Sequence, residues 1–337
     1  MAHDAASDLA RELPHVIVLV VLVLVLLVVV TKFNWVHCSQ IPGNWCEVYC
    51  NVVMRTHSRV ALVYGDDGIG DPTALENMIR RVRPYTYLEP VRLSDASYGM
   101  LKGYDLVILE HARSVSYKES RALREYLNKG GMMVWVGDSA SRHYYDQIDI
   151  TDVVARTPDD QLGPLERILN PNAPKSFNES GVNKTTIQRL LDHEMSVDEL
   201  ANFSQQLAEK GYFGEAAKKQ ARGFGPLQDV LLAKFVGVVD VSGYGANGSA
   251  TLKIVNRQNM MVRGLFYEFG VTPLRFAEVK ENAAGVDKVA VLSYGNREYT
   301  GIYETRYSGR VVYSALPLED LNSTTLLTNI LDYLVTC

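Results

Sequence analysis

The pattern of apolar and polar residues predicts strands and helices in alternation from Arg59 onward. Four apolar runs have the length and composition of buried strands: residues 59–64, 85–93, 104–110 and 132–137. Two segments between them place apolar residues at helical spacing: residues 72–82, with Pro72 near the first helical position, and residues 116–131, which end in glycine. Strands that alternate with helices in this way favour a doubly wound, mostly parallel sheet with right-handed crossovers.

The pattern changes after about Tyr145. Residues 146–235 are polar, with Pro and Asn punctuation and several short helical patterns, one of them opened by a capping box from Ser196 to Glu199. We interpret this stretch as a helical insertion. Strand patterns then return at residues 250–255, 274–281, 288–295, 299–309 and 309–317, and the chain ends in a predicted helix over residues 322–335.

One segment near the N-terminus has no polar side chain at all. Residues 16–30 rise only about 22 Å as a helix, so the span needs the apolar residues that follow, and we predict a transmembrane helix over residues 16–36. A cleaved signal peptide and a soluble core helix are the alternatives, but no small-x-small cleavage site follows the run and no residue marks a solvent face. The predicted organisation is a tail, the transmembrane helix, a juxtamembrane linker and one α/β domain with the insertion: residues 1–15, 16–36, 37–58 and 59–337.

Composition places the rest of the chain among ordinary globular proteins. The sequence has 47% hydrophobic and 22% charged residues and a formal net charge of -5. No run of Lys or Arg suggests contact with phosphates, so we predict no nucleic-acid partner.

The cysteines indicate an oxidising compartment. Three of the four cluster just beyond the apolar segment, and the fourth is the last residue: Cys38, Cys46, Cys50 and Cys337. Metal ligation is an alternative, but the spacings do not match known zinc patterns. We predict disulfides, with Cys337 bonded to Cys46 or Cys50, because a final helix antiparallel to the strands ends at the pole where the first strand begins.

Five N-x-S/T sequons support the same compartment: Asn178, Asn183, Asn202, Asn247 and Asn322. The basic residues that flank the apolar segment barely decide its orientation, since Arg11 faces Lys32 across it. We therefore expect a single-pass protein of the cell membrane, with a glycosylated, extracytoplasmic globular domain.

The stretch "GGMMVWVGDSAS", residues 130–141, has the spacing of a nucleophile elbow centred on Ser139. A serine hydroxyl needs an adjacent base before it can attack a substrate. His111 and His143 both follow predicted strands and are the candidate bases for a serine-dependent hydrolase or amidohydrolase.

Three segments carry a likeness to a known superfamily: "YDLVILE", "YLNKGGMMVWVG", and "SGRVVYSALPLED" followed by "LLTNILDYL". Over about residues 58–145 and 250–335 the chain resembles the class I glutamine amidotransferase-like superfamily. The nearer likeness is to its non-catalytic branches: the ThuA-like proteins and the related domains in components of the oligosaccharyltransferase and of the intraflagellar-transport machinery. The resemblance implies a flavodoxin-like α/β fold.

The resemblance also implies a degenerate catalytic site. The enzymes of the superfamily place a Cys at the elbow and a His-x-Glu-like pair after the late strand. Here the elbow has Ser139, and Leu316-Pro317-Leu318-Glu319 stands where the His is expected. We therefore expect a pseudoenzyme in which Ser139 is an N-cap rather than a nucleophile.

Carboxylates and turn residues should meet at the carboxyl edge of the sheet, where open α/β sheets bind ligands. The predicted ligand pocket consists of Asp66, Asp67, His111, Asp138, Ser139 and Glu319. Three of these acids, Asp66, Asp67 and Asp138, could hold a cation, but Asp and Gly are also ordinary turn residues, and we predict neither a metal nor a cofactor. The segment "GDDGIGD" lacks the Lys and the spacing of a phosphate-binding loop.

The function expected from the sequence is a membrane-anchored, non-catalytic interaction or glycan-recognition module of the cell envelope. Its expected partners are the lipid bilayer, other membrane or envelope proteins and glycans. Membership of a larger membrane complex fits the same features.

Overall fold

The computed structural model describes residues 2–32, 36, 41, 45–54, 57–144, 184–191, 194–196, 198–200, 202–203, 228–241, 250–282 and 285–335. The chain forms two compact units. One comprises Met1–Ser58 with the C-terminal Val335–Cys337, and the other comprises Arg59–Leu334.

The first unit begins with a long helix, α1 (Ala2–Lys32). Its part from Pro14 to Lys32 is long and apolar enough to cross a membrane, with a mean hydropathy of 3.1. A membrane anchor and a signal sequence both fit this helix. The helix starts earlier than residue 16, because the preceding residues, rich in Ala, Leu, Arg and Glu, are themselves good helix formers.

Helical structure also occurs in the segment that was predicted to be a linker. A short helix, α2 (Trp45–Val48), continues directly into one turn of π-helix, η2 (Tyr49–Met54). Cys50, in η2, is bonded in a disulfide. The side chains of Cys38, Cys46 and Cys337 lie outside the described residues, so the pairing of the cysteines stays a prediction.

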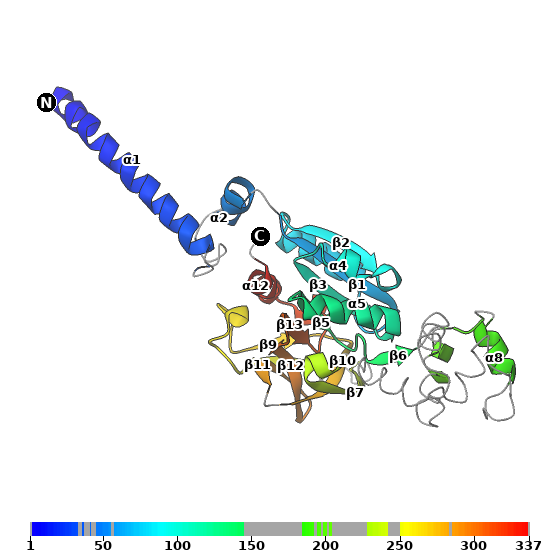
Figure 1. Ribbon diagram of the computed structural model, residues 1–337. Coiled ribbons are helices and arrows are strands. Elements are labelled where there is room, and N and C mark those ends of the chain that lie inside the picture. Colours follow the sequence, from blue (N-terminus) through cyan, green and yellow to red (C-terminus); the bar gives the residue numbers. More distant parts are fainter. Residues whose placement is uncertain are drawn as a thin grey trace. The chain divides into compact units, whose positions relative to one another are not determined.

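The second unit is built on a nine-stranded sheet (Figure 1). Its first five strands in space are parallel and have the order β2-β1-β3-β5-β13. This is the flavodoxin-like order, with the change of direction at β1 and β3. The five strands are β1 (Arg59–Asp67), β2 (Tyr87–Arg92), β3 (Leu106–Ala112), β5 (Met132–Val136) and β13 (Arg310–Ser314).

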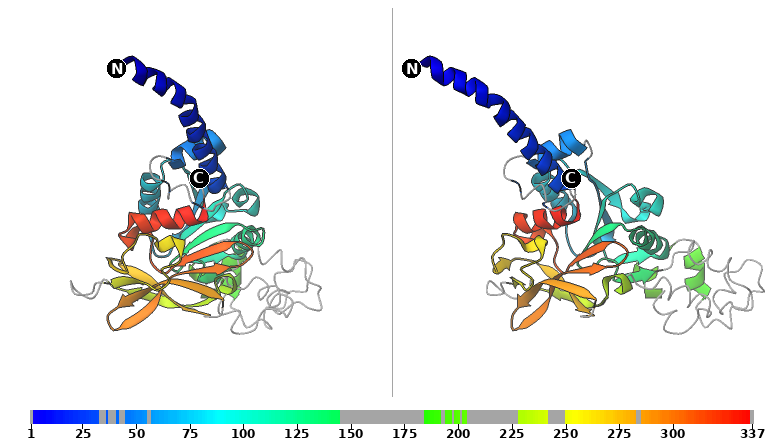
Figure 2. Two further views of the ribbon diagram at one scale, coloured as in Figure 1. Left: turned by 90° about the vertical axis from the view of Figure 1, so that its left-hand side faces the viewer. Right: turned by 60° about the vertical axis from the view of Figure 1, so that its left-hand side comes forward.

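The sheet continues beyond β13 through four antiparallel strands: β12 (Arg297–Arg306), β11 (Val286–Tyr294), β8 (Ala250–Ile254) and β9 (Glu268–Val271). Figure 2 shows them in yellow and orange, gathered in the lower part of both views. The sequence predicted most of these strands but not that they form an antiparallel half.

Two small sheets complete the unit. One pairs β7 (Ala233–Asp240) with β10 (Arg275–Glu281), and the other pairs β4 (Ser114–Ser116) with β6 (Arg142–Tyr144). The predicted insertion, residues 146–235, ends inside β7. The alternation in "KFVGVVD" marks that strand, since its burial alternates residue by residue.

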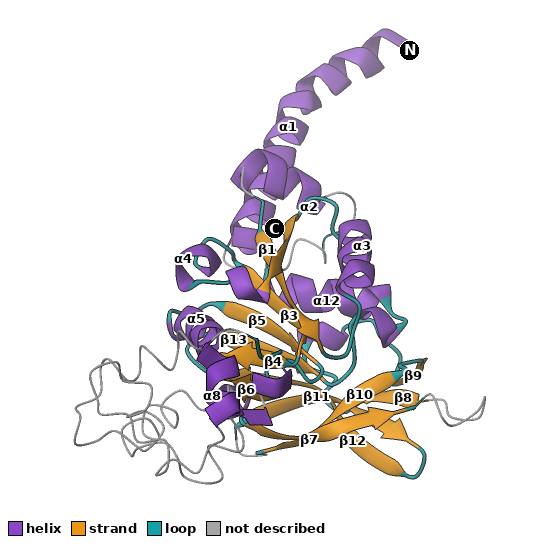
Figure 3. Cartoon of the chain, turned by 90° about the vertical axis from the view of Figure 1, so that its right-hand side faces the viewer, coloured by secondary structure: helices purple, strands orange, loops and turns teal. Residues whose placement is uncertain are grey.

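Helices cover both faces of the parallel half (Figures 1 and 3). The first pair, α3 (Pro72–Val82) and α12 (Thr324–Leu334), contact each other and are joined by an ion pair between Arg83 and Asp332. On the other face α4 (Tyr98–Leu101) contacts α5 (Tyr117–Asn128). The described connections also contain short 3-10 helices: η3 (Leu93–Asp95) after β2, η6 (Met260–Val262) between β8 and β9, and η7 (Glu319–Leu321) before α12.

Only parts of the predicted insertion are described. They include α8 (Lys184–Leu191) and α11 (Gln228–Leu231). The predicted capping box is confirmed: the Ser196 N–H donates to Glu199 Oε2 at 2.9 Å, and the Glu199 N–H donates to Ser196 Oγ at 3.3 Å. Within the insertion, only residues 184–191, 194–196, 198–200, 202–203 and 228–235 are described.

Candidate functional site

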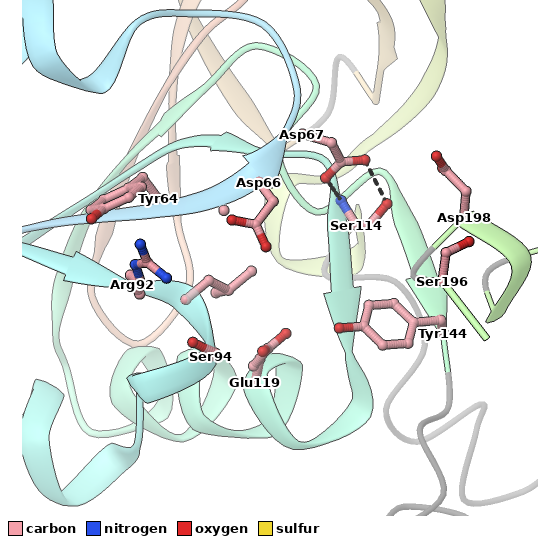
Figure 4. Close-up of a pocket in the computed structure, with 12 residues that line it drawn as sticks. Tyr64, Asp66, Asp67, Arg92, Ser94, Ser114, Glu119, Tyr144, Ser196 and Asp198 are labelled. Carbon is pink, nitrogen blue, oxygen red and sulfur yellow. Dashed lines mark hydrogen bonds between the residues drawn. The ribbon is translucent and has the colours of Figure 1, made fainter. Parts of the chain in front are cut away.

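A pocket with a volume of about 230 Å³ lies at the carboxyl edge of the parallel strands (Figure 4). It adjoins the point where the strand order changes direction at β1, the place where open α/β sheets bind ligands. Its walls come from the ends of β1 and β2, from η3, β4, β6 and α5, and from the insertion. The lining residues are Tyr64, Gly65, Asp66, Asp67, Arg92, Leu93, Ser94, Ser114, Glu119, Tyr144, Ser196 and Asp198.

The irregular end of β1 builds one wall. The register with β3 shifts between Tyr64 and Asp67, and the Asp67 carbonyl then accepts the Arg113 N–H at 2.8 Å. The Asp67 carboxylate accepts hydrogen bonds from the N–H and the Oγ of Ser114, at 3.0 and 2.7 Å. Asp67 and Ser114 are therefore fixed against each other, and their polar groups are largely satisfied.

A helix start fixes another wall. Glu119, in the first turn of α5, accepts the Ser116 N–H at 2.7 Å, and the Ser116 Oγ accepts the Glu119 N–H at 3.3 Å. This capping box keeps the Glu119 carboxylate at the helix end that faces the pocket.

Two charged groups in the pocket are free. Among the described residues, neither the exposed Asp66 carboxylate nor the exposed Arg92 guanidinium has a hydrogen bond or an ion pair. Figure 4 shows both on the side of the pocket near Tyr64, with Tyr144 and Ser196 on the other side. The pocket thus offers one free acceptor and one free donor between walls that hydrogen bonds already hold.

The structure separates the six residues of the predicted pocket. Asp66 and Asp67 line the pocket, whereas Asp138 is buried beside it, with 1% of its surface exposed. The Asp138 carboxylate accepts the Ile69 N–H at 2.9 Å and forms an ion pair with Arg113 at 2.5 Å. Asp138 therefore joins the loop after β1 to the turn after β5, and both of its carboxylate oxygens are bonded within the protein.

The turn after β5 is not a helix start. Residues 137–140 form turns, and the chain then enters β6 instead of a helix. The prediction that Ser139 is an N-cap is therefore wrong: the glycine-rich spacing specifies the tight turn, but the residues after it pair as a strand with β4. The indole N–H of Trp135, on β5, donates to the Ser139 carbonyl at 2.7 Å, and this hydrogen bond holds the turn against the strand.

An isoleucine side chain covers this turn. A Cβ added to Gly137, which has a φ of +61°, would lie 2.4 Å from Cγ1 of Ile69, and Ile69 itself is 3% exposed. Ser139 is also 3% exposed, and its Oγ has no hydrogen-bond partner. Ser139 is therefore a buried residue of a turn that Ile69 covers at Gly137.

Neither histidine is placed to activate Ser139. His111 has a φ of +51°, and its Nδ1 is buried without a hydrogen-bond partner. Its backbone lies so close to the loop after β1 that a Cβ on Gly68 would be 2.9 Å from the His111 carbonyl carbon. The Nε2 of His143 lies 3.3 Å from the Oγ of Ser120 on α5. Among the described residues, therefore, no imidazole lies within hydrogen-bond distance of the Ser139 hydroxyl.

Glu319, the last of the six, lies beside a buried acid that the sequence did not single out. Glu110, on β3, is fully buried, and a Cβ on Gly70 would lie 2.9 Å from its carboxyl group. Burial raises the pKa of Glu110 well above its usual value, and the charge of Glu319 raises it further. The Glu319 Oε1 accepts the Asp71 N–H at 2.5 Å, so this acid pair holds the start of α3.

Burial, together with the charge of Glu319, also raises the pKa of Asp320 to about 6. Among the described residues no group of three or more His, Cys, Asp or Glu side chains could hold a metal ion. Asp66, Asp67 and Asp138 do not form a shared cation site in the structure. Arg113 forms an ion pair with Asp138, and Ser114 donates a hydrogen bond to Asp67.

Two of the five sequon asparagines are described, and both are exposed. The Asn202 Oδ1 accepts a hydrogen bond from Arg142 at 3.0 Å, and the Asn322 Nδ2 donates to the Thr272 Oγ1 at 2.9 Å. Asn178, Asn183 and Asn247 lie outside the described residues.

Several pocket residues were missed by sequence reasoning, above all Arg92 and Ser114. Arg92 is the last residue of β2, and Ser114 follows β3 by two positions. A survey of the residues at and just beyond the carboxyl end of each predicted parallel strand would have found both, since these ends meet at one edge of the sheet.

No protein-family model matches the sequence, and no curated protein matches it. Among solved structures, the chain is similar to a ThuA-like protein from Bacteroides uniformis, with 12% identity, coverage of 83% of this chain and 93% of that one, and a TM-score of 0.47. It is also similar to a GMP synthase protein from Thermoplasma acidophilum, with 10% identity, coverage of 84% and 94%, and a TM-score of 0.42.

A β-galactosidase from Rahnella sp. R3 shows a third similarity, with 12% identity and a TM-score of 0.46. The match covers 82% of this chain but only 31% of the enzyme. The first two structures are a ThuA-like protein and a glutamine amidotransferase-like protein, the classes to which the sequence showed a resemblance. At these scores none of the three bears on function, and the fold class rests on the strand order itself.

Replacing Ser139 by Ala should leave the free energy of unfolding unchanged or raise it by up to about 1 kcal/mol, since the buried hydroxyl has no partner to lose. An N-cap serine would instead cost about 1 kcal/mol on replacement. Urea unfolding of the full chain in detergent measures the difference. A loss of 1 kcal/mol or more, or labelling of Ser139 by a fluorophosphonate, would contradict the buried, inert hydroxyl.

Replacing Glu110 by Gln should change how stability depends on pH. Because the pKa of Glu110 is higher in the folded than in the unfolded state, the folded state binds more protons from about pH 4 upward, and the free energy of unfolding falls as pH rises through that window. E110Q should reduce this fall, so its stability relative to the wild type should be greater at alkaline than at acidic pH. Urea midpoints across pH test this, with the exposed Glu298→Gln as the control; equal slopes for E110Q and wild type would refute it.

Proposed function

We propose that this protein is a membrane-anchored, non-catalytic recognition module whose pocket beside Asp66 and Arg92 binds one sugar ring of a glycan at the cell envelope. The observation that carries the proposal is the contrast between two neighbouring places at the same sheet edge. The turn at Ser139 is covered by Ile69, whereas the pocket beside it is open and has one free carboxylate and one free guanidinium.

The free groups suit a ligand with many hydroxyls. A hydroxyl can donate to the Asp66 carboxylate and accept from the Arg92 guanidinium, and both hydrogen bonds gain strength from the charge of the protein group. The exposed Ser94 hydroxyl, whose hydrogen bond to Asp95 Oδ1 is long at 3.5 Å, can donate or accept in the same way.

Size and shape point to a single ring. The pocket volume of about 230 Å³ is below the roughly 300–1,000 Å³ of sites for drug-sized molecules. Tyr64 and Tyr144 on opposite sides add apolar ring faces against which the C–H groups of a sugar can pack (Figure 4).

The proposed location is the outer side of a single-pass membrane anchor. Helix α1 supplies the candidate span, and no small-residue cleavage site follows it in the sequence. The disulfide at Cys50 and the exposed sequons at Asn202 and Asn322 are typical of an oxidising, glycosylating compartment. In this setting the module would bring a glycan to other membrane proteins within a larger complex.

A serine-dependent hydrolase is the alternative function. It would need Ser139 to reach both a base and a substrate, but the Oγ is buried without a partner, and His111 and His143 lie elsewhere. No observation in the described residues favours it over recognition.

Binding to an array of neutral hexose oligosaccharides tests the proposal with the full chain in nanodiscs. Asp66→Asn and Arg92→Gln should each weaken the binding about 10- to 100-fold, because each removes a charge-assisted hydrogen bond. Arg81→Gln, the same change at an exposed site on α3, should bind like the wild type.

Two results would overturn the sugar assignment. One is no binding to any neutral oligosaccharide by the folded wild-type protein. The other is preferential binding of a small zwitterion such as phosphoethanolamine, which would place its ammonium on Asp66 and its phosphate on Arg92.

A further inference from the structure

The segment that follows α1 folds back onto it. The indole N–H of Trp45 donates to the Thr31 Oγ1 at 3.0 Å, and the Thr31 hydroxyl donates to the Leu27 carbonyl at 2.7 Å. Thr31 is 1% exposed as a result. These two bonds satisfy the indole N–H of Trp45 and the hydroxyl of Thr31 where α2 meets the last two turns of α1.

One side of the α2–η2 segment, Trp45–Met54, is packed. Trp45, Tyr49 and Cys50 are buried and form a small core with Leu27 and Val28 of α1. The Trp45 and Tyr49 rings lie 6.3 Å apart. The disulfide at Cys50 adds a covalent restraint to the packed side.

The other side is apolar and uncovered. Val48, Val52, Val53 and Met54 are 44%, 64%, 39% and 43% exposed. The segment has one charged residue, Glu47. Four exposed apolar side chains within seven positions are unusual for a water-facing helix, since soluble surfaces rarely gather apolar residues in one patch.

The position of the α1 contact along the candidate membrane span indicates what covers the apolar side of the α2–η2 segment. The 19 residues of the candidate span rise roughly 28 Å as a helix, close to the roughly 30 Å of a hydrocarbon core, so the whole stretch to Lys32 is needed to cross. Leu27 and Thr31 lie in its last two turns. A segment that packs on them is therefore held at the boundary between acyl chains and headgroups.

We propose that the α2–η2 segment is an interfacial helix that lies in the same bilayer surface as the end of α1, with Val48, Val52, Val53 and Met54 against lipid. The inference rests on the proposed membrane anchor. It gives the uncovered face one occupant, the acyl–headgroup boundary, where helices lie with one apolar face buried. Trp45 and Tyr49 suit the same depth, where aromatic residues are enriched.

Fluorescence quenching by brominated phospholipids tests the proposal in nanodiscs with the full chain. Val52→Trp adds a fluorophore on the lipid side, and Val236→Trp adds one at an exposed position of β7 as the matched control. After subtraction of the unmodified protein, the added emission of V52W should be lost most strongly with lipids brominated near the headgroup, and that of V236W should be retained. Val53→Trp gives a second reading if V52W does not fold.

The outcomes separate this inference from the anchor. If the protein stays in the nanodisc but V52W and V53W are not quenched, water or a second copy of the chain covers the face, and the interfacial helix is refuted while the anchor stands. Quenching only by bromine near the chain ends also refutes it, since the segment would then lie inside the bilayer. If the protein does not remain with the disc, the anchor itself fails, and this inference with it.

Discussion

The hydrogen bond from the Ile69 N–H to the Asp138 carboxylate is the contact on which the arrangement at the sheet edge depends. It joins the loop after β1 to the turn after β5, across β3. Arg113 forms an ion pair with the buried Asp138 carboxylate. This ion pair compensates the free-energy cost of burying the negative charge. With the loop fixed there, the Ile69 side chain lies over Gly137, and the turn at Ser139 is covered.

The same loop determines the surroundings of the other candidate residues. Gly68 and Gly70, with φ values of +134° and +103°, pass against the His111 backbone and the Glu110 carboxyl group at distances that no larger residue permits. The residues just before the loop, Asp66 and Asp67, are left on the open side. The edge of the sheet is thereby divided into a packed part over β3 and β5 and an open pocket beside β1 and β2, and recognition is proposed for the open part.

Much of the fold could be predicted from the sequence, because local signals agree with the tertiary structure. The helix predicted at residues 72–82 is α3 with the same limits, as expected from Pro72, and in the structure the Asp71 side chain caps its start. The capping box at Ser196 is present as predicted. Strand β7 was not predicted, and the predicted insertion ends inside it, since a strand with alternating exposure is easily taken for a polar segment.

The candidate site was harder to predict. The glycine and small-residue spacing around Ser139 fits an open elbow and a covered turn equally well, and the side chain that covers it comes from Ile69, about seventy residues away in sequence. Glu110 reads as one polar residue at the end of an apolar strand, and only the tertiary structure brings it to Glu319. Arg92 carries no motif and becomes a candidate because β2 ends beside β1.

The most direct test of the covered turn and the open pocket is the alkylation rate of a single introduced cysteine at each place. In the disulfide-bonded full chain, Ser139→Cys and Asp66→Cys can be labelled with iodoacetamide and followed by peptide mass spectrometry. Because a core position reacts only when the structure opens, at a cost of several kcal/mol, Cys at position 139 should react roughly a hundredfold or more slowly than Cys at position 66. Similar rates at the two positions would contradict the account, since they would show that the turn after β5 is open to small molecules.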